Sequence, residues 1–245
     1  MKSNIENKLN RKVGKAINQY SMIEAGDKVL IGVSGGKDSL SLLRILCDRL
    51  KWLPIKYEVT AVHVINDYDL NKDKKKEVLS KFFNEIGCKY LFEEIKIKEK
   101  NKKKEVDCFW CAWNRRKTIF KIMERDKFTK VAFGHHKDDV VETILMNMFW
   151  TGHISSINPV QELFEGKVKI IRPLIFCCES EMERYAKEKS LPVIESICPK
   201  NKNSKRAIVK GIIEKLAEES QDIKTNILRA PSRVRSDYIS DISES

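Results

Sequence analysis

The sequence predicts an α/β fold with a doubly wound, mostly parallel sheet of five strands. Short, almost continuous apolar segments alternate with longer segments in which apolar residues recur at helical spacing. Strands covered by helices on both faces have this continuous apolar pattern. Hydrophobic residues make up 42% of the 245 residues and charged residues 33%, as is typical of a globular domain.

Each element can be placed on the sequence. Strands are expected at 28–33, 57–65, 90–95, 130–133 and 168–171. Helices are expected near 8–20, 42–50, 72–86, 108–123 and 138–150, with one more from 201 onward. Ligands of such sheets bind beyond the carboxyl ends of the strands. Three candidate site residues lie at these ends: Ser34, His63 and Gly134.

The chain divides into three predicted parts. Residues 1–22 form a short basic N-terminal helix, and residues 23–200 form the α/β domain. Residues 201–245 add a C-terminal helix, with Ile208, Ile212 and Leu216 on one face, and a polar tail. This organisation has one core and two appendages.

The charge and cysteine content limit the class of protein. The 47 basic and 35 acidic residues give a net charge of +12, which suits a polyanionic partner, although lysine is frequent throughout the sequence. No stretch approaches the roughly 18 apolar residues of a membrane span, and residues 1–10 lack an apolar signal core. Seven cysteines without a signal sequence indicate a reducing compartment, so we expect a cytoplasmic protein that is not bound to a membrane.

The strongest local signal is a hexapeptide between the first strand and its helix. Two glycines let the backbone approach an anion, and the N–H groups at the helix start can bind phosphate oxygens. The serines add hydroxyl donors, the lysine adds a charge, and the aspartate adds a helix cap or a metal ligand. The spacing differs from Walker A, and the alternative is an ordinary glycine-rich turn. The residues are Ser34, Gly35, Gly36, Lys37, Asp38 and Ser39.

The cysteines suggest a second site. Cys108 and Cys111 stand three residues apart at a helix start, where two thiolates can share a metal or a cluster. A closed zinc site needs four ligands, and the adjacent Cys177 and Cys178 project differently and are better explained as core thiols. Three ligands, with Cys198 as the third, would leave one position of an iron–sulfur cluster open.

The hexapeptide resembles the phosphate-binding loop of the PP-loop ATPases, which adenylate a carbonyl oxygen and release pyrophosphate. The segment Gly134-His135-His136-Lys137-Asp138-Asp139 resembles their second nucleotide motif. The resemblance implies that Gly134, His135, Asp138 and His63 join the hexapeptide in binding ATP and Mg²⁺. Carboxylates at a helix start can hold Mg²⁺ against phosphates, but Asp138 and Asp139 can also be helix caps.

Nearly the whole chain resembles the tRNA 2-thiocytidine synthetase family of PP-loop enzymes. The similar segments are 13–17, 22–27, 34–39, 134–136, 146–149 and 172–174, together with Cys198 followed by Arg206. The resemblance implies an ATP-dependent tRNA-cytidine 2-sulfurtransferase that makes 2-thiocytidine at position 32 of the anticodon loop. It also implies a 4Fe-4S cluster on Cys108, Cys111 and Cys198, whose unligated iron carries the sulfur. A homodimer and a sulfur donor such as a cysteine desulfurase are further implications, and the implied catalytic residues are Asp139, Lys37 and Arg115.

Basic residues around these motifs are candidate tRNA contacts. They are Lys102, Lys103, Lys104, Arg116, Lys205 and Arg206. Trp110 and Trp113 lie among basic residues and can either stack on an unpaired base or pack beneath the cluster; we favour packing.

Departures from the family pattern leave the target nucleotide open. Phe109 and Trp110 separate the two cysteines, and Ile157-Asn158-Pro159 replaces a Met-Pro-Pro motif. One alternative is a tRNA 2-thiouridine synthetase, and another is a thiolase with a persulfide on Cys111 or Cys198 and no cluster. A PP-loop ligase for a small molecule and a non-enzymatic RNA-binding protein are further alternatives. The intact hexapeptide and the Asp138-Asp139 pair argue against the last.

Overall fold

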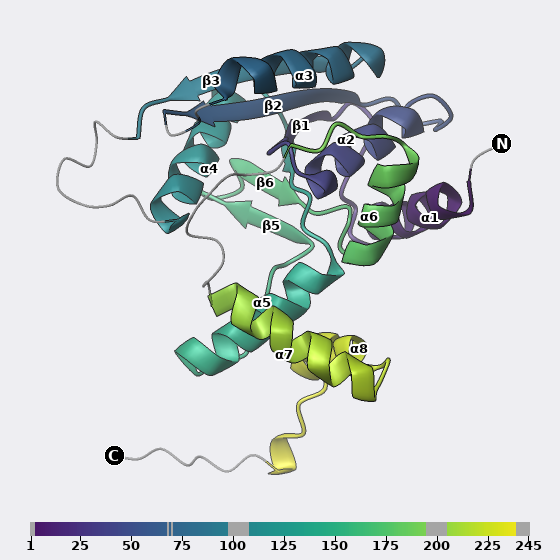
Figure 1. The fold of residues 1–245 in the computed structure, drawn as a ribbon, viewed down its shortest axis with the longest axis vertical. Helices are drawn as coiled ribbons and strands as arrows, with labels where there is room; N and C mark the ends of the chain where they lie inside the picture. The colour runs from purple at the N-terminus through teal and green to yellow at the C-terminus, as the bar shows by residue number, and fades with distance from the viewer. Residues whose placement is uncertain (1–2, 68, 70, 98–107, 195–204, 239–245) are drawn as a thin grey trace. The chain divides into compact units, whose positions relative to one another are not determined.

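A six-stranded sheet forms the centre of the computed structural model, which describes residues 3–67, 69, 71–97, 108–194 and 205–238. The strand order is β3-β2-β1-β4-β6-β5 (Figure 1). Five strands are parallel, and β5 runs antiparallel to β6. The strands are β1 (Lys28–Gly32), β2 (Glu58–Asn66), β3 (Lys89–Ile95), β4 (Lys130–Ala132), β5 (Val160–Leu163) and β6 (Val168–Ile171).

The predicted fold class is confirmed, but the predicted number of five strands is wrong. The missed strand is β5, in which Val160 pairs with Ile171 and Leu163 pairs with Val168. It is a short edge strand of mixed polarity, so it lacks the continuous apolar run that identifies a buried parallel strand.

As far as β4, helices and strands alternate along the chain. The bounds are α1 (Asn4–Gln19), α2 (Lys37–Arg49), α3 (Lys72–Glu85), α4 (Cys108–Arg125), α5 (Lys137–Thr151), α6 (Glu179–Glu188), α7 (Lys205–Glu219) and α8 (Ile223–Arg229). Short 3₁₀ turns follow at Ala230–Ser232 and Ser236–Tyr238. No helix of the described part of the chain is long and apolar enough to cross a membrane.

One face of the sheet packs against α4. Leu30, Val62 and Val131 from three neighbouring strands form a buried cluster with Ile122 and Met123 of α4. On the strand β2 the side chains alternate between the two faces. His63 therefore lies on the opposite face from Val62, and its ring meets Phe92 of β3 edge-on.

The sheet has a topological switch point between β1 and β4. On one side of β1 lie β2 and then β3, the next two strands of the chain. On the other side lies β4, followed in the sheet by β6 and β5, which come later in the chain. A crevice for ligands forms beyond the carboxyl ends of the strands at such a point. The 34–39 loop follows β1 and Gly134 follows β4, so both lie at this crevice.

The chain forms two compact units. Unit 1 contains Met1–Lys137 and Asn158–Cys198, including the whole sheet. Unit 2 contains Asp138–Ile157 and Pro199–Ser245, and its core joins Val141 and Leu145 of α5 to Val209 and Ile213 of α7. The domain boundaries at 22/23 and 200/201 stay a prediction.

Candidate active site

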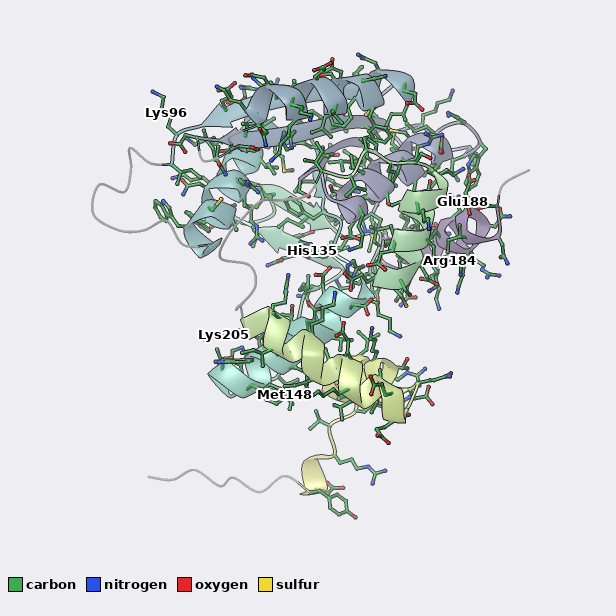
Figure 2. The ribbon with its side chains drawn as sticks, viewed as in Figure 1. Lys96, His135, Met148, Arg184, Glu188 and Lys205 are labelled. Carbon is green, nitrogen blue, oxygen red and sulfur yellow. The ribbon has the colours of Figure 1, made fainter. Side chains whose placement is uncertain are left out.

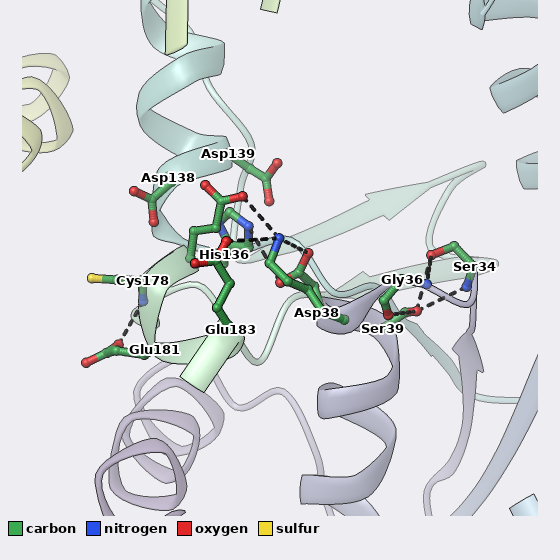
Figure 3. A network of polar contacts seen from close by, with 12 residues as sticks. Ser34, Gly36, Asp38, Ser39, His136, Asp138, Asp139, Cys178, Glu181 and Glu183 are labelled. Atoms are coloured by element: carbon green, nitrogen blue, oxygen red, sulfur yellow. Dashed lines mark hydrogen bonds and ion pairs between the residues drawn. The ribbon is translucent and has the colours of Figure 1, made fainter. Parts of the chain in front are cut away.

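The 34–39 loop turns sharply from β1 into α2. Gly35 has φ +91°, a left-handed conformation that disfavours side chains. The Ser39 hydroxyl accepts a hydrogen bond from the N–H of Ser34 (3.2 Å) and donates one to the carbonyl of Gly36 (3.0 Å), as Figure 3 shows. The hydroxyl of Ser34 accepts from the N–H of Gly36 (3.2 Å). The loop is therefore held in shape by its own hydroxyl groups.

Two other segments close around this loop. A Cβ atom at Gly134 would lie 3.0 Å from the backbone of Asp38 and Ser39, so only glycine allows this close approach. The N–H of Ile194 donates to the carbonyl of Gly35 (2.9 Å). The segments after β1 and β4 thus meet as the sequence predicts.

Lys37 lies among carboxylates. Its ammonium is 3.1 Å from Glu179, 3.7 Å from Asp38 and 3.8 Å from Glu183. Burial lowers the pKa of Lys37, but these carboxylates outweigh burial and raise it above its ordinary value. Lys37 is therefore a fixed positive charge at the loop, held from the side by α6.

His135 and His136 have different surroundings. His136 is buried, with Nε2 3.9 Å from a carboxylate oxygen of Asp38. The Nε of Arg172 donates to Nδ1 of His135 (3.3 Å), so Nδ1 carries no proton and the proton of a neutral His135 is on Nε2. Burial, reinforced by the charge of Arg116, lowers the pKa of Arg172 to about 10. Arg172 still carries its charge at neutral pH and fixes the tautomer of His135.

His63 lies beside the start of the loop. Its Nδ1 donates to the carbonyl of Val33 (2.7 Å), the residue before Ser34. Burial lowers the pKa of His63, and the charge of Arg115 acts in the same direction, so the ring is neutral at pH 7. Its Nε2 is buried and has no hydrogen-bond partner in the described part of the chain.

The Cys111 thiol lies at the carboxyl end of β2. The side-chain amide of Asn66, the last residue of this strand, donates to Sγ of Cys111 (3.4 Å). Arg115 follows one turn later on α4, and its Nε is buried without a hydrogen-bond partner among the described residues. Cys111 and the 34–39 loop thus belong to the same unit and lie at the carboxyl ends of the neighbouring strands β2 and β1.

The predicted cysteine triad is only partly described. Cys108 begins α4, and Cys198 lies outside the described residues. Among the residues that are described, no three His, Cys, Asp or Glu side chains are grouped so that they could hold a metal ion. Cys47, Cys88 and Cys177 are buried, as expected of core thiols.

Asp138 and Asp139 begin unit 2 and have basic partners within it. Asp138 is buried and forms an ion pair with Lys224 (2.5 Å). Asp139 lies 3.6 Å from Arg206, which also pairs with Glu142 (3.3 Å). The carboxylates predicted for Mg²⁺ and the predicted tRNA contact Arg206 are therefore ion-paired with neighbouring side chains.

The remaining predicted tRNA contacts are divided between the described and undescribed parts. Lys102, Lys103 and Lys104 lie outside the described residues. Arg116 is exposed on α4. Lys205 is exposed at the start of α7 (Figure 2). Its ammonium lies over the ring of Trp150 at 5.5 Å.

Several residues at the site were not predicted from the sequence. Glu179 and Glu183 belong to α6, a helix that was not predicted. A signal was present, because acidic residues are frequent in the first turn of a helix and three of them alternate here before Tyr185. Nothing in the local sequence indicated that Asn66 or Arg172 would bond to Cys111 or His135.

The residues present fit ATP and an iron–sulfur cluster. The close contact at Gly134 and the left-handed conformation of Gly35 both disfavour a side chain at these positions. The backbone of the 34–39 loop is therefore open to close approach by phosphates. On α4 the side chain of Cys111 offers sulfur, the ligand atom that Fe–S clusters use, and the Asn66 amide supplies a hydrogen bond to it. Such bonds around a ligand tune a metal site.

Comparisons with known proteins agree with this arrangement. The family model of the PP-loop domain matches residues 4–216. The tRNA-cytidine(32) 2-sulfurtransferase of Saccharophagus degradans is 33% identical over 97% of this chain and 77% of its own length. The enzyme of the same name from Pseudomonas putida is 33% identical over 97% of this chain and 87% of its own.

Two solved structures of PP-loop-like fold are also similar to this chain. The U34-tRNA thiolase NcsA from Methanococcus maripaludis, solved with its [4Fe-4S] cluster, matches with a TM-score of 0.75 and 26% identity. The match covers 92% of this chain and 76% of that one. The NH3-dependent NAD synthetase of Campylobacter jejuni matches with a TM-score of 0.50 and 18% identity, covering 93% and 88% of the two chains, and shows the fold alone.

Proposed function

The chain belongs to the tRNA 2-thiocytidine synthetase family of PP-loop proteins, and from this we propose that it is an ATP-dependent, iron–sulfur-dependent tRNA-cytidine 2-sulfurtransferase. The substrate is cytidine 32 of the tRNA anticodon loop, and the product is 2-thiocytidine. One observation carries the proposal: the 34–39 loop after β1, approached closely by Gly134, shares a unit with the Cys111 thiol at the carboxyl end of β2.

The reaction needs ATP because the C2 oxygen of cytidine is a poor leaving group. This oxygen attacks the α-phosphorus of ATP, the bond to the β-phosphate breaks, and pyrophosphate leaves. The base then carries AMP on its former carbonyl oxygen. Sulfur at the oxidation level of sulfide forms a bond to C2, and AMP departs with that oxygen.

The 34–39 loop serves the first step. Its N–H groups and the start of α2 bind the phosphates that leave as pyrophosphate. Lys37 adds a positive charge, which the phosphates must share with Glu179. His135, with its proton held on Nε2 by Arg172, presents a donor rather than an acceptor. The assignment of Asp138 to Mg²⁺ and of Asp139 to catalysis rests on the family resemblance.

Cys108, Cys111 and Cys198 are the proposed ligands of a 4Fe-4S cluster. When bound, the cluster supplies an iron with an open position that can hold the transferred sulfur. Asn66 directs its N–H at Sγ of Cys111 and so stabilises negative charge there. Arg115 adds a positive charge one helical turn from Cys111.

The partners of the reaction are also proposals. The net charge of +12 supports tRNA as the partner. A cysteine desulfurase is the proposed sulfur donor, and we propose a homodimer in the cytoplasm.

The proposal can be tested in a reconstituted reaction. The full chain, prepared anaerobically with iron and sulfide, receives unmodified tRNA, ATP and sulfide, and both AMP and thiolated nucleosides are measured. Lys37→Ala should lose AMP formation and thiolation together. Cys111→Ser should lose thiolation, whereas the half-exposed Cys178→Ser serves as a matched control that retains it. AMP formation that does not depend on tRNA would favour a small-molecule ligase instead.

A 2-thiouridine synthetase is the second candidate, because the NcsA match is a U34-tRNA thiolase. The nucleoside analysis of the same reaction separates the two. Thiolation of uridine with no change in cytidine would mean that the reaction is as proposed but that the target nucleotide is a uridine.

A further inference from the structure

Trp113 lies on the outer face of α4. Ile122, nine residues later on the same helix, is buried in the core against the sheet. At about 100° per residue, nine residues place the two side chains on opposite sides of the helix. Trp113 accordingly exposes 46% of its surface, which contradicts the packing that the sequence analysis favoured.

Two cations share this outer face. Arg116 and Lys117 follow Trp113 by three and four residues, the spacing at which side chains are neighbours on a helix. Both are exposed, and neither forms an ion pair within the described part of the chain. The charge of Arg116 even reaches the buried Arg172, whose pKa it helps to lower. An anion beside Arg116 would be favoured because it would pair with an exposed cation and would offset the repulsion between Arg116 and Arg172.

The other tryptophans have different surroundings. Trp52 is 49% exposed, but the guanidinium of Arg49 lies over its ring at 4.9 Å. Trp150 is 38% exposed, and the ammonium of Lys205 lies over it at 5.5 Å. Trp110 is half-buried. Among the described residues no ring or cation is stacked on Trp113.

We propose that Trp113, Arg116 and Lys117 form a platform for single-stranded RNA. The indole stacks on one unpaired base, and the two cations contact the phosphates beside that base. Stacking on an aromatic side chain requires a base whose face is free, as in a tRNA loop but not in a duplex. Trp113 follows Cys111 by two residues, about 200° around the helix axis, so RNA bound here meets the outer face of the helix whose opposite side carries the Cys111 thiol. The inference rests on the proposed function, because it takes tRNA as the substrate.

Binding measurements separate stacking from charge. The affinity of the full chain for an unmodified anticodon stem-loop is measured at several salt concentrations by fluorescence anisotropy. Trp113→Ala should weaken binding about tenfold without changing the salt dependence, and Trp113→Phe should retain most of the affinity. Arg116→Ala and Lys117→Ala should each make the negative slope of log K against log salt shallower, by about 0.7. Trp52→Ala is the matched control and should bind as the wild type does.

Several outcomes would overturn the platform. Wild-type affinity in Trp113→Ala would do so, and so would an equal loss for a fully paired RNA duplex. A lower melting temperature in Trp113→Ala, in step with the affinity, would indicate packing. A wild-type protein that binds no tRNA would overturn the proposed function itself, whereas normal binding by both the wild type and Trp113→Ala would overturn the platform alone.

Discussion

Gly134 lies so close to the 34–39 loop that a methyl group at position 134 would displace the loop. The contacted atoms belong to the backbone of Asp38 and Ser39, which cannot rotate away as a side chain can. Gly134→Ala should therefore weaken ATP binding at least about tenfold while the protein stays folded, because the N–H groups move away from the phosphates. Isothermal titration with ATP measures the loss.

Gly211 offers the matched control for this variant. It lies within α7, where a methyl group on its Cα would meet only open space. Gly211→Ala should therefore be harmless or stabilise the helix by about 1 kcal/mol. Equal ATP affinity in Gly134→Ala and Gly211→Ala would contradict the assignment of Gly134 to the phosphate site.

Glu179 competes with ATP for Lys37. Removing its charge in Glu179→Gln should lower the KM for ATP about two- to fivefold, the size of a partly screened ion pair. Glu183 is farther from Lys37 and more exposed, so Glu183→Gln should have a smaller effect. Steady-state kinetics of AMP formation distinguish the two variants. A higher KM in Glu179→Gln would mean that Glu179 orients Lys37 for the phosphates.

The residues of the 34–39 loop could be predicted from the sequence, but the side chains from distant parts of the chain that contact them could not. A hexapeptide between a strand and a helix is a local pattern, and Gly35 has the left-handed backbone of a tight turn. The hydroxyl groups, expected as donors to phosphate, form hydrogen bonds within the loop. The contact between Lys37 and Glu179 joins residues that are 142 positions apart. No periodicity or spacing carries that information, because it depends on how α6 packs.

At the scale of helices, Glu181 ties α6 to α1. Its carboxylate accepts the N–H of Cys178 (2.8 Å) and pairs with Lys12 (2.7 Å) and Lys8 (2.9 Å). Burial raises the pKa of Glu181, but these three donors outweigh it and lower the pKa to about 2.

Glu181→Gln should lower the free energy of unfolding by about 1–3 kcal/mol at pH 7. A carboxyl group with a lowered pKa stabilises the folded state above its ordinary pKa, and this contribution fades as the pH falls toward 2. Urea unfolding at several pH values should therefore show the wild type and the variant converging below about pH 4.5. A difference that does not change with pH would contradict the role of this charge.

The packing of α7 on α5 within unit 2 leads to a further prediction. Ile213 is buried against α5, whereas its neighbour Ile212 is 37% exposed. Ile213→Ala should destabilise the packing of α5 on α7 by about 2–4 kcal/mol, and Ile212→Ala should have little effect. Hydrogen exchange of α7 measures the difference. Equal exchange in the two variants would mean that this core does not hold α7.

Elements were predictable where their pattern was long or continuous. The strand β6 is found at the residues predicted for it, and α3 and α5 are found within about a residue. In the strand β5 only the end residues Val160 and Leu163 are apolar, and α6 has few apolar positions among many charges. Neither carries a periodic signal strong enough to exceed that of a surface loop.

At the scale of the whole chain, composition predicted the class of protein but not the arrangement of its units. The charge of +12 and the alternating elements indicated a basic α/β protein. The association of 138–157 with the C-terminal residues in unit 2 depends on side chains such as Val141 and Val209, which are far apart in the sequence. Local periodicity identifies their helices without identifying their partners.

The central claim is that this protein thiolates cytidine in tRNA, and nucleoside mass spectrometry of cellular tRNA tests it most directly. Cells that lack the gene should lose 2-thiocytidine, and the wild-type gene should restore it. The Lys37→Ala gene should not restore it, because ATP can no longer activate the base. An unchanged level of 2-thiocytidine in the deletion strain would contradict the claim.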